Sequence, residues 1–305
     1  MATSALTSTW ASENRDVKAR VNYLPVDGKM IYTEEDLPKP KHFGDWLPSS
    51  RYMTFHNARG MEKVFQLDVN GFEFYRLPDK ERDFSSDEWL KAEFYSEMEQ
   101  ILLKVTGASH IFTLGHVLRR TENKFFLEAL DTERYNRFST VWPHSDWEVL
   151  LEPDQLGKKV SEQEMIKSLF ESGKFGDRVD EAKKAAESAS RWAVVQIWTP
   201  LKTVERDPLA LCDGLTVDHS EWRLRKSANS YPVLTHGNKE ETHKWYYLDR
   251  MQPSEMYIFK GCDSKHARDL KWRGYAGPHA AFALPDSEDK PPRESLEARF
   301  ICFWD

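Results

Sequence analysis

The sequence predicts a mixed α+β fold with a mainly β core, in which the helices flank a sheet or barrel. Strand-like runs concentrate late in the chain, at residues 192–198, 256–260 and 296–304. Helix-start signals occur earlier, at residues 85–88 and 161–164. Hydrophobic residues make up 40% of the chain and aromatic residues 13%, which is enough to form a large core. This order of elements favours a sheet-based domain with helical inserts.

The first 50 residues are rich in proline and charge, as in the segment 37–41, and show little periodicity. We expect residues 1–50 to form an extended arm that lies on a domain. A chain of 305 residues is long enough for two domains, but one elaborated β-rich domain fits equally well. The prediction is a single domain over residues 51–305.

Residues 51–77 have a strand-like pattern. The segments 64–68 and 72–76 alternate between apolar and polar residues around Asn70-Gly71, a dipeptide typical of a hairpin turn. The sequence therefore predicts a β-hairpin here.

Two S-x-x-E capping boxes predict helices. The first, Ser85 to Glu88, precedes apolar residues at helical spacing, and the helix is expected to end near Gly107. The second, Ser161 to Glu164, predicts a helix to about residue 170. Residues 177–191 are charged and alanine-rich and are expected to form an exposed helix.

Charge and apolar patterning exclude several classes of protein. There are 43 Lys and Arg against 50 Asp and Glu, a net charge of −7, which argues against a nucleic-acid partner. No apolar run approaches the roughly 18–20 residues that span a bilayer. Residues 1–15 lack the apolar region of a secretory signal. We expect a cytoplasmic protein without a membrane partner.

The three cysteines, Cys212, Cys262 and Cys302, are far apart and include no CxxC pair. This spacing argues against a disulfide framework or a cysteine-based zinc site. We expect buried free thiols in a reducing compartment.

Residues 111–120 and 140–151 are further candidate strands, and the second contains His144-Ser145-Asp146. On a strand, residues i and i+2 point to the same face with Cα atoms about 6.6 Å apart. An imidazole and a carboxylate on one face can then bind a single metal ion. A second histidine from a neighbouring strand would complete a 2-His-1-carboxylate triad.

His279 is the preferred second histidine. It precedes a turn-rich stretch, and Arg293 and Ser295 follow fourteen and sixteen residues later at the start of a β-run. This spacing predicts a hairpin with His279 on one strand and Arg293 and Ser295 on one face of the next. The planar guanidinium of arginine binds a carboxylate in two places, and a hydroxyl two residues later adds a third bond. A dicarboxylate cosubstrate could be anchored there while its other end binds the metal.

Other histidines compete for this role. His266 lies among charged residues and 27 positions before Arg293, which is too far for adjacent hairpin strands. His219-Ser220-Glu221 would make a rarer triad variant, but its segment is polar and has no β pattern. For His144 and Asp146, the alternative is a local hydrogen bond on a surface strand.

Several sequence blocks resemble the non-haem Fe(II)- and 2-oxoglutarate-dependent dioxygenases, and in particular the fungal gibberellin desaturase and hydroxylase/desaturase group with the cephem methoxylase-like proteins. The family pattern is His-x-Asp, a distal His, and Arg-x-Ser ten to fourteen residues later. The resemblance covers roughly residues 50–305. The blocks that carry it, besides His144-Ser145-Asp146, are Gln196-Ile197-Trp198-Thr199-Pro200-Leu201, Pro208-Leu209-Ala210-Leu211-Cys212-Asp213, Cys262-Asp263-Ser264, Pro278-His279-Ala280-Ala281-Phe282 and Pro292-Arg293-Glu294-Ser295-Leu296-Glu297-Ala298-Arg299.

The resemblance implies a double-stranded β-helix, a jelly-roll barrel with its site inside one mouth. It implies Fe(II) bound by His144, Asp146 and His279, and 2-oxoglutarate bound by Arg293 and Ser295. Arg299 shares their strand parity and is expected to face the same cavity. The implied reaction uses O₂ to hydroxylate, desaturate or rearrange a small hydrophobic natural-product intermediate in secondary metabolism.

The chain also departs from the family pattern. The group usually reads Asn-x-Trp-Arg-Pro where this chain has Gln196-Ile197-Trp198-Thr199-Pro200, so Thr199 replaces an arginine. Trp147 follows the His-x-Asp where relatives carry small polar residues. We expect Trp147, Gln196, Trp198 and Thr199 to line the substrate pocket, although the tryptophans could equally be core residues.

These departures leave an alternative function open. The chain could be a non-catalytic or weakly active partner subunit of a dimeric oxygenase, since a fold can persist when activity is lost. Iron binding by the purified protein would separate the two. A homodimer, or a heterodimer with a related subunit, is expected in either case.

Overall fold

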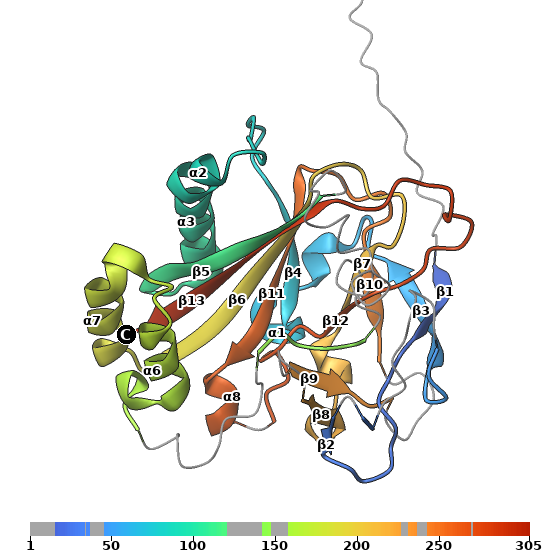
Figure 1. The fold of residues 1–305 in the computed structure, drawn as a ribbon, viewed down its shortest axis with the longest axis horizontal. Coiled ribbons are helices and arrows are strands. Elements are labelled where there is room, and N and C mark those ends of the chain that lie inside the picture. Colours follow the sequence, from blue (N-terminus) through green and yellow to red (C-terminus); the bar gives the residue numbers. More distant parts are fainter. Residues whose placement is uncertain are drawn as a thin grey trace, which may run out of the picture.

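The computed structural model describes residues 16–33, 35–36, 46–120, 142–147, 158–226, 231–236, 243–269 and 271–305. Within these ranges the strands form two five-stranded sheets and one three-stranded sheet (Figure 1). Helices lie along the sheet drawn on the left of Figure 1. This is the mixed α+β architecture with a β core that the sequence predicts.

The first sheet, called the major sheet below, is antiparallel throughout. Its strands, in spatial order, are β4 (Phe72–Arg76), β11 (Glu255–Asp263), β6 (Arg191–Pro200), β13 (Ser295–Trp304) and β5 (His110–Arg119). Four of these strands confirm the predictions for residues 111–120, 192–198, 256–260 and 296–304. The central strands were readily predicted because both of their faces are buried, which produces continuous apolar runs.

The second five-stranded sheet, called the minor sheet, contains in spatial order β1 (Val17–Val21), β3 (Arg51–Asn57), β10 (Trp245–Tyr247), β7 (Leu209–Cys212) and β12 (His279–Ala281). The three-stranded sheet contains β2 (Ile31–Tyr32), β8 (Trp222–Arg225) and β9 (Tyr231–Leu234). Part of the predicted arm therefore contributes strands, since β1 pairs with β3 and β2 pairs with β8.

The predicted hairpin around Asn70-Gly71 is wrong. Instead, a 3-10 helix η1 (Glu62–Val64) and a short helix α1 (Leu67–Asn70) precede β4. Gly71 ends α1 in the left-handed conformation, with φ +83°. A left-handed glycine is common both in hairpin turns and at helix C-termini, so the dipeptide alone could not separate the two.

The first capping box predicts its helix to within one residue. Ser86 rather than Ser85 is the N-cap, and its hydroxyl accepts a hydrogen bond from the backbone N–H of Trp89. The helix runs through α2 (Asp87–Trp89), a π-helical turn η2 (Leu90–Phe94) and α3 (Tyr95–Thr106). It ends at the left-handed Gly107, as expected.

The second capping box does not form. Ser161 lies in the 3-10 helix η4 (Val160–Glu162), and helix α6 (Glu164–Glu171) begins after Gln163 without a side-chain cap. Helix α7 (Val179–Ser188) follows a 3-10 turn η5 (Gly176–Arg178). Only one side of α7 is exposed, because its alanines Ala182, Ala185 and Ala186 are buried. The remaining short helices are η6 (Gly214–Thr216), η7 (His219–Glu221) and α8 (Lys265–Arg268).

The core is divided by the major sheet. On one face, residues of β6 and β13 such as Ile197 and Ala298 pack against Phe94 and Met98 of the α2–α3 helix. On the other face, Trp198 and Phe259 pack with Leu211 of the minor sheet. The two five-stranded sheets therefore share a hydrophobic layer, and polar residues at one end of this layer form the candidate site.

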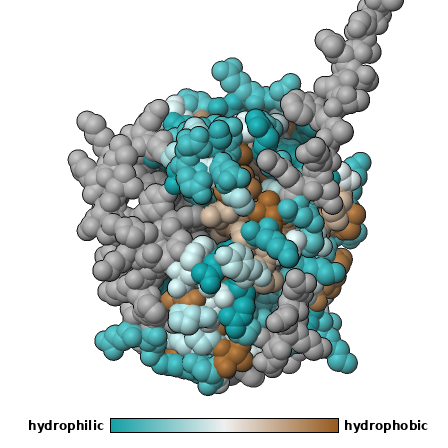
Figure 2. Space-filling view, turned by 90° about the vertical axis from the view of Figure 1, so that its right-hand side faces the viewer, coloured by the Kyte–Doolittle hydropathy of each residue, from teal (hydrophilic) through white to brown (hydrophobic). Residues whose placement is uncertain are grey.

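Two further predictions from the sequence concern the cysteines and membrane-spanning segments. The three cysteines are free and buried, as predicted. Among the described residues, no helix has the length and apolarity needed to cross a membrane. On the side shown in Figure 2, hydrophobic atoms lie in small patches separated by hydrophilic residues.

Candidate active site

His144 and His279 lie directly opposite each other in an antiparallel β-bridge. The backbone N–H of each donates to the carbonyl of the other, over N···O distances of 3.1 and 3.0 Å. Such pairing places the two side chains next to each other, and the ring centroids are 4.3 Å apart. Backbone pairing thus joins residues that are far apart in the sequence.

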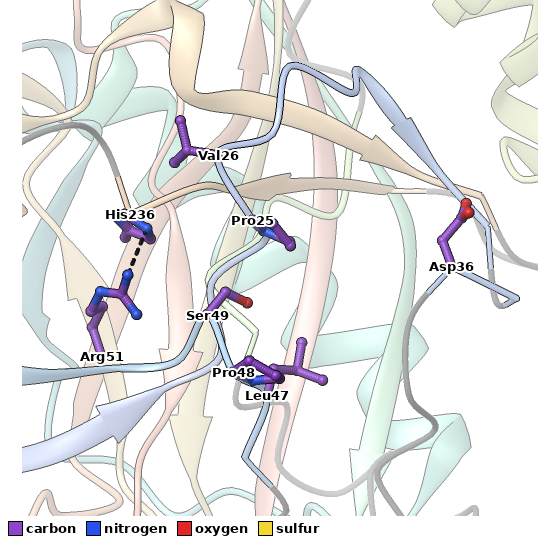
Figure 3. Close-up of a pocket in the computed structure, with 8 residues that line it drawn as sticks. All are labelled: Pro25, Val26, Asp36, Leu47, Pro48, Ser49, Arg51 and His236. Carbon is purple, nitrogen blue, oxygen red and sulfur yellow. Dashed lines mark hydrogen bonds between the residues drawn. The ribbon is translucent and has the colours of Figure 1, made fainter.

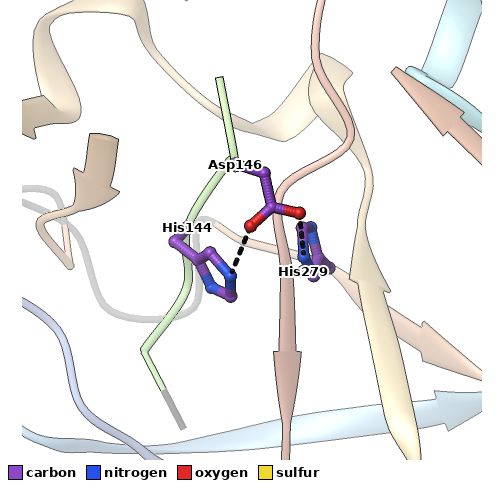
Figure 4. Close-up of side chains that lie close together, drawn as sticks. All are labelled: His144, Asp146 and His279. Carbon is purple, nitrogen blue, oxygen red and sulfur yellow. Dashed lines mark ion pairs between the residues drawn. The ribbon is translucent and has the colours of Figure 1, made fainter. Parts of the chain in front are cut away.

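The carboxylate of Asp146 lies between the two imidazoles (Figure 4). Its Oδ1 is 3.6 Å from Nε2 of His144, and its Oδ2 is 3.8 Å from Nε2 of His279. The three residues offer ligand atoms that all lie within 4.8 Å of one another. One ion can contact two imidazole nitrogens and a carboxylate oxygen in this arrangement.

Both imidazoles are oriented by the backbone. Nδ1 of His144 donates to the carbonyl of Trp142 at 2.7 Å, and Nδ1 of His279 donates to the carbonyl of Gly277 at 3.2 Å. A proton on Nδ1 leaves Nε2 with its lone pair, and both Nε2 atoms face Asp146. Fixed tautomers of this kind are typical of metal-binding histidines.

The ionisation states also suit a cation. Burial, with the neighbouring His144, lowers the pKa of His279 to about 3, so its imidazole is neutral near pH 7. Burial raises the pKa of Asp146, but its contacts with His144, His279 and Arg299 outweigh burial and hold this pKa well below its usual value. Neutral imidazoles and an ionised carboxylate are the protonation states that bind metal.

Two side chains donate to Asp146 from the inner face of the major sheet, which is the face that packs on the minor sheet. Nε2 of Gln196 donates to Oδ2 of Asp146 at 2.6 Å, and Nη2 of Arg299 donates to the same oxygen at 3.3 Å. Arg299 also donates to Glu297 at 2.5 Å. Glu297 was not predicted, although strand parity places it on the same face as Ser295 and Arg299.

Arg293 and Ser295 lie at the other end of this face. Arg293 is buried, its Nη1 donates to the carbonyl of Asp207 at 2.7 Å, and its guanidinium is 5.4 Å from the ring centroid of Trp198. Burial, with the nearby Arg119, lowers the pKa of Arg293 to about 10. The hydroxyl of Ser295 is fully buried and has no hydrogen-bond partner among the described residues. A buried cation beside an unpartnered hydroxyl is suited to bind a carboxylate.

The predicted hairpin between His279 and Arg293 is wrong. His279 is in β12, which pairs with β7 in the minor sheet, whereas β13 lies between β6 and β5 in the major sheet. The chain between them crosses from one sheet to the other. His279 therefore reaches the site from the minor sheet. Arg293 and Ser295 reach it from the start of β13 in the major sheet, and not from a strand adjacent to β12.

Two of the four residues predicted to line the substrate pocket are close to Asp146. Gln196 contacts Asp146, and Trp147 follows Asp146 in the chain. The ring of Trp147 packs on Gly261, where an added Cβ would be 2.5 Å from its Cδ1. The β-bulge at Gly261 thus requires a residue without a side chain.

The other two residues, Trp198 and Thr199, are buried and pack against or bond to other parts of the fold. Trp198 is 2% exposed and stacks on Tyr257 with ring centroids 5.6 Å apart. The guanidinium of Arg293 lies over the other part of this packed ring pair, on Trp198. Thr199 has the strand parity of Ile197, which faces the α2–α3 helix, and its hydroxyl donates to the carbonyl of Glu255 at 3.0 Å. The prediction that Thr199 lines the pocket is corrected by this geometry, because successive residues of a strand point to opposite faces.

His266 and His219, the alternatives to His279 and His144, contact each other and not Asp146. Nε2 of His266 and Nδ1 of His219 are 2.9 Å apart, and the ring of His266 stacks on Tyr275 at a centroid distance of 3.6 Å. His219 lies in a 3-10 helix, consistent with the absence of a β pattern in its sequence.

A separate cavity of about 430 Å³ lies between the N-terminal segments and the end of β9 (Figure 3). Arg51 donates to His236 on one side of it, and Asp36 lies on the other. The cavity is lined by Pro25, Val26, Asp36, Leu47, Pro48, Ser49, Arg51 and His236, none of which the sequence predicts for the site. Leu47 belongs to the same buried cluster as Trp142, so this region supports the segment that carries His144.

Comparison with protein families gives one match over nearly the whole chain. The family described as an oxidoreductase/YMDC permease-like domain matches residues 21–303. Among curated proteins, the hydroxylase/desaturase efuI of Hormonema carpetanum is 27% identical over 265 residues, covering 82% of each chain. The α-ketoglutarate-dependent dioxygenase phiK of a fungal species is 29% identical over 79% of this chain and 80% of its own. The gibberellin cluster GA4 desaturase of Gibberella fujikuroi is 32% identical over 53% of this chain and 49% of its own.

Solved structures show the same relationship at the level of the fold. The iron and α-ketoglutarate-dependent endoperoxidase NvfI superposes with a TM-score of 0.65 and 21% identity, covering 95% of this chain and 98% of its own. A single-substitution variant of that enzyme gives the same TM-score at 22% identity, covering 95% of this chain and 99% of its own.

Proposed function

Because the chain belongs to the family of fungal Fe(II)- and 2-oxoglutarate-dependent dioxygenases, we propose that its oxidoreductase activity resides at His144, Asp146 and His279. The observation that carries the proposal is the geometry of these three residues. Their ligand atoms lie within 4.8 Å of one another, and both imidazoles direct Nε2 toward the carboxylate. This donor set is the 2-His-1-carboxylate arrangement suited to non-haem Fe(II).

Each group has a defined part in this proposal. Fe(II), when bound, supplies the O₂ and redox chemistry, in which 2-oxoglutarate is converted to succinate. His144, Asp146 and His279 would hold the metal through two imidazole nitrogens and a carboxylate oxygen. Asp146 contributes a negative charge that partly balances the cation.

Arg293 and Ser295 are proposed to bind the distal carboxylate of 2-oxoglutarate. The fit rests on the buried guanidinium of Arg293 and on the fully buried hydroxyl of Ser295, which lacks a partner in the described part of the chain. Trp198 beneath the guanidinium limits its movement. A carboxylate here would accept hydrogen bonds from both the guanidinium and the hydroxyl.

The fold is proposed to be a double-stranded β-helix, the jelly-roll that the sequence resemblance implies. Two five-stranded sheets that share a hydrophobic layer support this assignment, as does the TM-score of 0.65 with the NvfI structures. The site lies where the inner face of the major sheet meets β12 of the minor sheet.

The substrate is proposed to be a small hydrophobic natural-product intermediate that is hydroxylated, desaturated or rearranged. The names of the relatives support this range, since they include hydroxylase/desaturases and an endoperoxidase. The enzyme is favoured over a non-catalytic partner subunit because its relatives are dioxygenases and the described residues retain the complete triad. A homodimer or heterodimer stays a prediction, as does the cytoplasmic location.

The test measures metal binding and succinate release with Fe(II), 2-oxoglutarate, O₂ and a panel of terpenoid or amino-acid-derived substrates. We expect the wild-type protein to bind about one metal ion per chain. Substitutions His144→Ala, Asp146→Ala and His279→Ala should each reduce succinate release at least about 100-fold, because each removes a ligand. The half-exposed His110 provides the control His110→Ala, which should retain activity. Succinate release undiminished in the His144 and Asp146 variants would disprove the assignment.

A further inference from the structure

We propose that Arg299 and Gln196 are positioning residues for Asp146, holding its Oδ2 so that Oδ1 is presented to the metal. This role differs from the cosubstrate contact that the strand parity of Arg299 with Arg293 and Ser295 suggests. The inference rests on the proposed function, because it concerns the metal site assigned there.

The first argument is the number of donors on one oxygen of Asp146. Nε2 of Gln196 is 2.6 Å from Oδ2, and Nη2 of Arg299 is 3.3 Å from the same atom. Two donors satisfy the two lone pairs of a carboxylate oxygen. Oδ1, which lies 3.6 Å from Nε2 of His144, is then the oxygen with lone pairs available for a cation.

The second argument is that Arg299 is itself held in place. Its Nη2 donates to Oε1 of Glu297 at 2.5 Å, and Oε2 of Glu297 accepts from Arg119 at 3.1 Å. The side chain of Glu297 is only 7% exposed, so the carboxylate that joins the two arginines is largely shielded from water. A connected series of charged hydrogen bonds thus runs from Arg119 through Glu297 and Arg299 to Asp146.

The third argument concerns what the two donors do to the free energy of metal binding. A carboxylate without outer partners rotates and loses conformational freedom when it binds a metal. Partners that fix its orientation reduce this cost, and their loss typically weakens metal affinity by about 10–100-fold. Gln196 lies on β6 and Arg299 opposite it on β13, so the rigid major sheet sets the position of both donors.

One feature favours the alternative role of Arg299, a direct contact with the cosubstrate. The Nε atom of Arg299 is buried and has no hydrogen-bond partner among the described residues. A carboxylate or carbonyl of 2-oxoglutarate could accept from it. The experiment therefore measures the dissociation constants of the metal and of 2-oxoglutarate separately.

The probe is Co(II), which substitutes for Fe(II) and is followed by its visible absorption as it is titrated into the metal-free protein. 2-Oxoglutarate is then titrated into each variant at saturating Co(II) without O₂. For Arg299→Gln we expect the Co(II) dissociation constant to rise about 10-fold or more. The dissociation constant of 2-oxoglutarate should change less than about threefold.

Three further variants sharpen the comparison. Gln196→Leu removes the other donor to Oδ2 and should also weaken Co(II) binding about 10-fold. It also provides an independent test if Arg299→Gln does not fold. Arg293→Gln should give the reverse pattern, with Co(II) affinity kept and 2-oxoglutarate affinity lost. Arg82→Gln is matched to Arg299→Gln in charge, but Arg82 donates to Glu97 and has no part in the series of hydrogen bonds that reaches Asp146, so it should change the Co(II) dissociation constant less than about threefold.

The outcomes separate this inference from the proposed function. Unchanged Co(II) affinity in both Arg299→Gln and Gln196→Leu would overturn the inference and leave the metal site intact. A loss of 2-oxoglutarate affinity alone in Arg299→Gln would also overturn it and would assign Arg299 to the cosubstrate. If the wild-type protein bound no Co(II), the proposed function would fail first, and the inference with it.

Discussion

His144, Asp146 and His279 show how backbone pairing brings a short motif together with a distant histidine. The His-x-Asp spacing supplies two ligand types but does not indicate which of the other histidines joins them. The bridge between His144 and His279 supplies this information, because it places their side chains in contact. The carbonyls of Trp142 and Gly277 then fix both tautomers.

At the same scale, Glu297 could not be assigned from sequence. An acidic residue in a β-run is usually exposed, and its burial is tolerated here because Arg119 and Arg299 donate to its two oxygens. Arg119 lies on a different strand, so the pairing of β5 with β13 decides whether the glutamate is stabilised.

Substitution of Arg293 gives a prediction at the residue scale. Arg293→Gln should raise the KM for 2-oxoglutarate about 10–100-fold, since a charge-assisted hydrogen-bond pair contributes about 1.5–3 kcal/mol. Arg293→Lys should recover only part of the affinity, because an ammonium group lacks the planar arrangement of donors. Initial rates of succinate release over a range of 2-oxoglutarate concentrations measure both. An unchanged KM in Arg293→Gln would contradict the assignment.

Among the secondary-structure elements, buried strands were predicted best and local turns least well. Strands β6, β11 and β13 are buried on both faces, and their apolar runs are unmistakable. Asn70-Gly71 does not form the predicted hairpin turn, because the left-handed conformation of Gly71 suits a hairpin and a helix end equally. The surroundings of Gly71 resolve this ambiguity, since its backbone packs against Ala276.

Two left-handed glycines test this packing. A Cβ on Gly71 would lie 2.0 Å from the carbonyl oxygen of Ala276, whereas a Cβ on Gly107 would meet no atom within 4 Å. Gly107→Ala should cost about 1 kcal/mol of unfolding free energy from backbone strain alone. Gly71→Ala should cost about 1–3 kcal/mol more, because it also forces the backbone apart. Urea unfolding of both variants measures the difference, and equal losses would show that the contact with Ala276 is unimportant.

At the scale of the whole molecule, the proposed active site combines three parts of the chain. His279 comes from the minor sheet, Gln196, Ser295 and Arg299 come from the major sheet, and His144 and Asp146 lie on a segment that bridges to β9. Since no single element contains the site, its geometry depends on the packing of the two five-stranded sheets.

The buried His266, which contacts the half-buried His219, predicts a pH dependence of global stability. Burial, with His219 and Arg273 nearby, lowers the pKa of His266 from its ordinary 6.5 to about 4. Between these values the unfolded chain binds a proton that the native protein does not, so stability falls as the pH decreases from 6.5 toward 4. The contribution of one such group is at most about 1.4 kcal/mol per pH unit.

The comparison of wild-type protein with His266→Phe isolates this contribution. Phenylalanine keeps an aromatic ring on Tyr275 but cannot be protonated. We expect the unfolding free energy of the metal-free variant to depend less steeply on pH between about 6.5 and 5. Denaturant unfolding at several pH values measures the slopes, and parallel slopes would exclude His266 as the source.

The sequence by itself determined the β core, the main helix ending at Gly107, the free thiols, and the residue types of the proposed metal and cosubstrate sites. These features follow from local periodicity, capping and side-chain chemistry, which neighbouring residues specify. The tertiary structure alone decided that β12 and β13 belong to different sheets, that Thr199 faces away from the site, and that Arg299 contacts both Asp146 and Glu297. These features depend on which strands pair and which faces meet, and such long-range pairing is determined by the packing of the whole chain rather than by any one segment.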